Sequence, residues 1–122
     1  MKGRGLKISL LVAVAALGVW ATAAVAGDGA GAAATKRASL HDDFFSPKRI
    51  TISAGDRVKW TWRGSNDHNV RFRKVPRGVS RKPGSRTQSS GSFTRQLRKR
   101  GTYRYVCTIH EALGMTGSVK VE

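Results

Sequence analysis

The chain has 122 residues, of which 23 are Lys or Arg and seven are Asp or Glu, so that its formal charge is +16 at pH 7. This length allows one small domain and excludes a multidomain architecture. The single cysteine excludes an internal disulfide, and the basic excess favours anionic partners over cationic ones.

The N-terminus has the pattern of a secretory signal peptide. Three basic residues lie before an apolar run over residues 8–26, which ends in Ala24-Val25-Ala26 and is followed by Gly27. We therefore expect a signal peptide over residues 1–26 and export to the periplasm, the cell surface or the medium. Since the run is nearly long enough to span a bilayer, a retained membrane anchor is the alternative.

After this segment the composition changes twice. Residues 27–37 contain Gly, Ala and polar residues without an apolar period, and we expect a flexible linker there. Residues 38–122 show short apolar alternations separated by turn residues, with no helical period of useful length. This pattern predicts an all-β sandwich, with strands over residues 50–53, 58–63, 68–73, 93–97, 102–107 and 119–121.

Strand parity places one histidine in the predicted core. His68 shares a face with Val70 and Phe72, whereas Asn69 and Arg71 lie on the opposite face. The apolar neighbours indicate that the imidazole of His68 points to the interior. Taken alone, this position fits an ordinary hydrogen-bonded core histidine better than a metal ligand.

A long basic segment follows. Residues 74–92 are rich in Gly, Ser, Pro and Arg, and they predict a mobile loop. Between Arg71 and Arg100 there are eleven bases and no acid. This 71–100 stretch suits an anionic polymer or a membrane surface, although a solvated loop without a partner explains it equally well.

The most specific motif lies near the C-terminus. Cys107, His110 and Met115 have the spacing C-x2-H-x4-M after a predicted strand. A thiolate, an imidazole and a thioether, completed by the imidazole of His68, are donors that suit an electron-transfer copper ion. A metal bond also explains a lone cysteine in an exported protein. We therefore predict one copper site formed by His68, Cys107, His110 and Met115.

These motifs resemble those of the cupredoxin family of small blue (type 1) copper proteins, and the ligand loop is plastocyanin-like. The resemblance covers about residues 38–122. It implies a Greek-key β-sandwich in which His68, Cys107 and His110 are the strong ligands and Met115 is a long axial one. It also implies that Asn69 joins the two ligand segments by hydrogen bonds. The matching segments are Asp42-Asp43-Phe44-Phe45-Ser46-Pro47, Ile50-Thr51-Ile52-Ser53-Ala54-Gly55-Asp56-Arg57-Val58-Lys59-Trp60, Asp67-His68-Asn69-Val70, Gly101-Thr102-Tyr103-Arg104-Tyr105-Val106-Cys107 and Gly117-Ser118-Val119-Lys120-Val121.

The predicted function is single-electron transfer by cycling of Cu(II) and Cu(I), without enzymatic activity. Three histidines, of which His41 is expected to be an ordinary surface residue, leave too few ligands for a second, open copper site. We expect a monomer whose redox partners carry acidic docking surfaces and approach His110 beside a small apolar rim of Ala112 and Leu113. The alternatives are a copper storage or delivery protein and a basic polyanion-binding domain.

Overall fold

The computed structural model describes residues 32–122. The predicted signal peptide and the first part of the predicted linker lie outside the described residues. The described chain contains β1 Thr35–His41, β2 Phe44–Ser46, β3 Arg49–Ile52, β4 Arg57–Trp62, β5 Arg71–Lys74, β6 Ser92–Gln96, β7 Gly101–Val106, the short 3-10 helix η1 Glu111–Leu113 and β8 Thr116–Val121. Within residues 32–122 no helix is long and apolar enough to cross a membrane.

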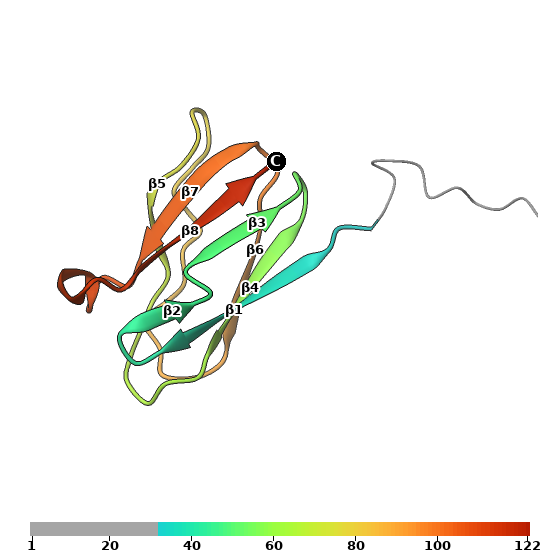
Figure 1. Ribbon diagram of the computed structural model, residues 1–122. Helices are drawn as coiled ribbons and strands as arrows, with labels where there is room; N and C mark the ends of the chain where they lie inside the picture. The colour runs from blue at the N-terminus through green and yellow to red at the C-terminus, as the bar shows by residue number, and fades with distance from the viewer. Residues whose placement is uncertain (1–31) are drawn as a thin grey trace, which may run out of the picture. The chain divides into compact units, whose positions relative to one another are not determined.

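The strands form two four-stranded sheets that face each other (Figure 1). One sheet has the order β2-β1-β4-β6 and the other has the order β3-β8-β7-β5. Side chains from both sheets meet in one buried cluster, where the Trp60 ring of the first sheet lies edge-on to the Tyr105 ring of the second at 5.3 Å between centroids. The predicted all-β sandwich is therefore confirmed.

Alternation of apolar and polar residues explains why these segments are strands. In β4, Val58, Trp60 and Trp62 are buried while the residues between them are half-buried. In β7 the same period buries Tyr103 and Tyr105. The buried side chains of each strand face the opposite sheet. Their burial fixes the register of the strand, because a shift by one residue would turn every apolar side chain outward.

The first strand begins earlier than the composition indicates. β1 starts at Thr35, inside the segment predicted as a flexible linker, and it pairs in parallel with β4 from Thr35 opposite Arg57. The carboxylate of Asp56 also accepts a hydrogen bond from the Ala34 N–H at 3.0 Å. Because the side chains of residues 35–37 are exposed, this part of the strand has no apolar period by which the sequence could reveal it.

The segment between β5 and β6 has no regular strand, as predicted, but it is fastened to the sandwich. The guanidinium of Arg95 donates hydrogen bonds to the carbonyls of Ser80, Arg81 and Pro83. The buried hydroxyl of Ser85 accepts the N–H of Val70 at 2.7 Å. These bonds satisfy backbone groups of a long loop and oppose the mobility expected from its composition.

The buried Tyr105 makes the stability of the protein depend on pH in the alkaline range. Burial raises the pKa of Tyr105 from 10.0 to about 12. The unfolded chain loses this proton near pH 10, so the stabilisation is complete below pH 10 and is lost as the pH rises toward 12. Between pH 9 and pH 12 we expect the free energy of unfolding to fall by about 2 kcal/mol more in the wild type than in a Tyr105→Phe variant. Urea denaturation at the two pH values measures this, and parallel losses in both proteins would contradict it.

Candidate metal centre

Three potential ligands meet at one end of the sandwich. His68 lies just before β5, Cys107 directly follows β7, and His110 lies in the loop between β7 and β8. The Sγ of Cys107 is 3.8 Å from Nδ1 of His68 and 3.6 Å from Nδ1 of His110, and the two Nδ1 atoms are 3.1 Å apart. His68 and Cys107 are buried, whereas 14% of the His110 side chain is exposed.

These separations fit one shared metal ion. In protein zinc sites imidazole nitrogen lies about 2.0 Å from the metal and thiolate about 2.3 Å, so that donors of one ion of this size are about 3–4 Å apart. All three distances fall in that range. A single thiolate combined with two imidazoles, in a site closed to bulk water, suits copper.

The carboxylate of Asp42 fixes the orientation of the His68 ring. Nε2 of His68 donates a hydrogen bond to Oδ1 of Asp42 at 3.0 Å, which leaves the lone pair of Nδ1 pointing toward Cys107. On the other ligand, Nε2 of His110 lies 3.5 Å from Oδ1 of Asp43. Two successive acids thus contact the outer nitrogens of the two imidazoles.

Asp42 also organises the loop that precedes His68. Its carboxylate accepts hydrogen bonds from the N–H groups of Ser65 and Asn66, at 3.0 and 2.9 Å. The bond from Asn66, followed by that from His68, lowers the pKa of Asp42 from 3.8 to about 2. Gly64 permits this close approach, because a Cβ there would lie 2.3 Å from Oδ1 of Asp42. Sequence reasoning missed this role, although Asp42 and Asp43, which form the turn between β1 and β2, lie in one of the matching segments.

Asn69 connects the two ligand segments, as the resemblance implied. Its Oδ1 accepts the N–H of Thr108 at 2.8 Å, and its Nδ2 donates to the hydroxyls of Thr108 and Thr87 at 2.7 and 3.0 Å. Its predicted outward orientation is wrong, since Asn69 is 2% exposed. The reason is that β5 begins only at Arg71, so strand parity does not apply to the residues before it.

Met115 is held beside Cys107 through the backbone. The N–H of Cys107 donates to the carbonyl of Met115 at 3.0 Å, and the N–H of Met115 donates to the carbonyl of His110 at 3.2 Å. Gly114, at φ 87°, supplies the left-handed turn that this return requires. The Met115 side chain is fully buried in the core cluster. The structure therefore brings three donor atoms together and closes the loop at the fourth predicted ligand.

The remaining histidine is not part of this cluster. The ring of His41 stacks on the exposed Phe44 with 4.7 Å between centroids. A group of three or more His, Cys, Asp or Glu side chains with closely spaced ligand atoms could hold a metal ion. Within residues 32–122, His68, Cys107 and His110 form such a group.

Comparisons with known proteins agree with this geometry. The family of copper binding proteins described as plastocyanin/azurin matches residues 33–122. Plastocyanin of Prochlorothrix hollandica is 42% identical over 82 residues, which cover 64% of this chain and 63% of that protein. Amicyanin-alpha of Methylorubrum extorquens is 34% identical over 110 residues, covering 90% of this chain and 88% of the relative. The matched part is thus less than two thirds of the Prochlorothrix protein.

A solved structure supports the fold. Oxidized plastocyanin from Dryopteris crassirhizoma superposes with a TM-score of 0.63 at 27% identity, over 71% of this chain and the whole of that one. This similarity agrees with the cupredoxin-like architecture expected from the sequence.

The contact between Asp42 and His68 generates a prediction about metal affinity. An Asp42→Ala variant loses the acceptor that orients the imidazole, and loss of such a partner weakens metal binding by about 10–100-fold. Competition with a chromophoric copper chelator measures the affinity. Asp67→Ala is the matched control, because it removes an exposed carboxylate next to His68 in the chain. Equal affinities of the two variants would contradict the role of Asp42.

Proposed function

Because the chain belongs to the plastocyanin/azurin family of copper-binding proteins, we propose that it carries single electrons and that one copper ion is its redox centre. The observation that supports this most directly is the convergence of one thiolate and two imidazole nitrogens within 3.8 Å of one another. His68, Cys107 and His110 would hold the ion strongly, and Met115 would be a fourth, weaker ligand. When bound, copper supplies a one-electron couple whose potential depends on the axial ligand and on the surroundings of the thiolate.

The protein's contribution is to hold these donors still. Two of the three clustered side chains are fully buried, and hydrogen bonds accepted by Asp42 and Asn69 fix the segments that carry them. Packed cores resist small displacements. The donors therefore change position little between oxidation states, which keeps the reorganisation cost of electron transfer low.

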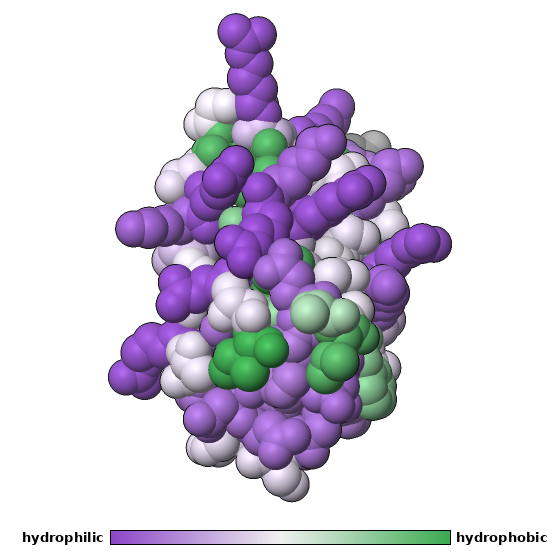
Figure 2. Space-filling model, turned by 90° about the vertical axis from the view of Figure 1, so that its left-hand side faces the viewer, coloured by the Kyte–Doolittle hydropathy of each residue, from purple (hydrophilic) through white to green (hydrophobic). Residues whose placement is uncertain are grey.

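Electrons would enter through His110, which is the partly exposed member of the cluster, with 14% of its side chain accessible. Beside it, Ile109 and Leu113 are 50% and 70% exposed, and Ala112 is exposed as well. Figure 2 shows hydrophobic side chains gathered on the face that includes this loop, below projecting hydrophilic ones. An apolar surface of this kind is suited to brief contact with redox partners.

We do not propose an enzymatic role. The clustered donors serve one ion, and His41 stacks on Phe44 away from them. If His68, Cys107, His110 and Met115 all bound the ion, no coordination position would remain for a substrate.

The leader pattern of residues 1–26 supports export of the protein, which would act as a monomer outside the cytoplasm. Mass spectrometry of the protein recovered from the exported fraction tests this, and we expect an N-terminus at Gly27. Recovery of the intact chain from the membrane fraction would instead show a retained anchor.

The colour of the copper complex tests the proposed site. Addition of Cu(II) to the purified protein should give an intense blue colour, which a Cys107→Ser variant lacks because the thiolate is the source of the strong metal–ligand covalency. Met115→Leu should keep the blue colour and shift the reduction potential. A colourless complex of the wild-type protein would contradict the proposal, and a copper couple that is irreversible in voltammetry would favour copper storage or delivery.

A further inference from the structure

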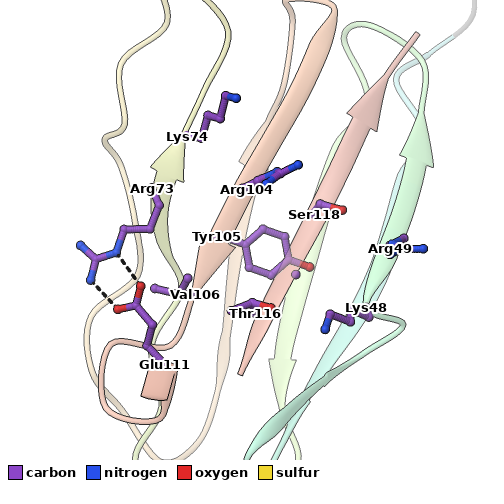
Figure 3. A pocket seen from close by; sticks show the side chains of 11 residues that line it. Lys48, Arg49, Arg73, Lys74, Arg104, Tyr105, Val106, Glu111, Thr116 and Ser118 are labelled. Carbon is purple, nitrogen blue, oxygen red and sulfur yellow. Dashed lines mark hydrogen bonds and ion pairs between the residues drawn. The ribbon is translucent and has the colours of Figure 1, made fainter. Parts of the chain in front are cut away.

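A basic groove crosses the outer face of the sheet β3-β8-β7-β5 (Figure 3). It has a volume of about 490 Å³ and runs from β3 to the loop that carries His110. We use the name basic groove for this surface. Its charged lining residues are Lys48, Arg49, Arg73, Lys74, Arg104 and Glu111.

The strand register places three of these cations in one row. Arg49 lies opposite Ser118, Ser118 lies opposite Arg104, and Arg104 lies opposite Lys74. Like charges directly opposite each other destabilise a sheet. Because the row contains no acid, an anion from outside the chain would relieve its repulsion.

A β-bulge increases the charge of this face. The register between β5 and β7 shifts between Phe72 and Lys74, and Arg73 and Lys74 are both exposed although they are neighbours in the chain. A bulge re-aims side chains in this way. Two successive basic side chains thus reach the same surface, where strict alternation would show one.

The acidic residue that lines the groove, Glu111, is already paired with Arg73. Glu111 receives hydrogen bonds from Nη2 of Arg73 at 2.8 Å and from Nε of Arg73 at 3.3 Å (Figure 3). Such two-pronged pairs are the strong form of the Arg–carboxylate interaction. The positive charge of Lys48, Arg49, Lys74 and Arg104 is therefore not balanced by any acidic side chain lining the groove.

We propose that the basic groove receives acidic side chains of a protein redox partner, while the apolar surface around Ile109 and Leu113 contacts the same partner. This inference rests on the proposed electron-transfer function. Glu111 directly follows His110, so a partner bound in the groove lies beside the expected point of electron entry. A protein fits better than a nucleic acid, because the one aromatic residue of the lining, Tyr105, is 0% exposed and offers no ring for base stacking.

The test uses two probes and matched variants. The full copper-loaded protein, labelled with ¹⁵N, is titrated at low ionic strength with an octaglutamate peptide and, separately, with an oligothymidylate of equal charge. The groove variant is Lys74→Glu with Arg104→Glu, and a Lys74→Gln with Arg104→Gln variant guards against misfolding. The control, Lys36→Glu with Arg57→Glu, makes the same charge change at exposed positions of the other sheet.

We expect octaglutamate to shift amide signals along the basic groove, and the groove variant to weaken its binding by about tenfold or more, several times the loss in the control. Equal losses in both variants would overturn the proposal, since they would show general charge attraction. Tighter binding of oligothymidylate in the groove would also overturn it, in favour of a nucleic acid. The visible spectrum and potential of the wild type report separately on the copper site, so that failure of the electron-transfer function is distinguishable from failure of the groove.

Discussion

The two-point contact between Asn69 and Thr108 joins segments that lie 39 residues apart in the chain. One segment carries His68, and the other carries Cys107 and His110. This contact adds to the pairing of β5 with β7, which ends beside both segments at Arg71 opposite Val106. The Asn69 side of this contact is buried and all its bonds are part-buried, and a satisfied polar network in such a place is rigid and specific. The arrangement of the metal centre therefore depends on a small polar connection at the end of an apolar sandwich.

The features that could be predicted from the sequence are those that depend on residues close together in the chain. The strands β4 and β7 were predictable because each alternates large apolar residues with polar ones against a single core. The spacing from Cys107 to Met115 was informative because one loop carries three donors. By contrast, the start of β1 at Thr35 depends on a parallel strand more than twenty residues away. The roles of Asp42 and the burial of Asn69 likewise arise only when distant segments meet, and no local period encodes them.

Acidic and basic side chains have different roles in this structure. Five of the six acids in residues 32–122 make specific contacts: Asp42 with His68, Asp43 with His110, Asp56 with backbone groups, Glu111 with Arg73 and Glu122 with Lys120. They orient imidazoles, close turns and steady strand ends. Most of the basic side chains are instead exposed to solvent, on the surfaces of the sheets and on the long loop between β5 and β6. The charge excess noted from the composition is therefore a property of the surface, separate from the forces that build the core.

The loop from Cys107 to Met115 begins and ends on one backbone hydrogen bond, from the Cys107 N–H to the Met115 carbonyl. Beyond this bond, β7 and β8 continue in register from Val106 opposite Thr116 to Gly101 opposite Val121. The loop is thus separable from the sheet. Changes to residues between its two ends would leave the pairing of β7 with β8 intact. Metal geometry and scaffold stability can consequently diverge at different rates in evolution, with the loop adapting to new potentials on an unchanged sandwich.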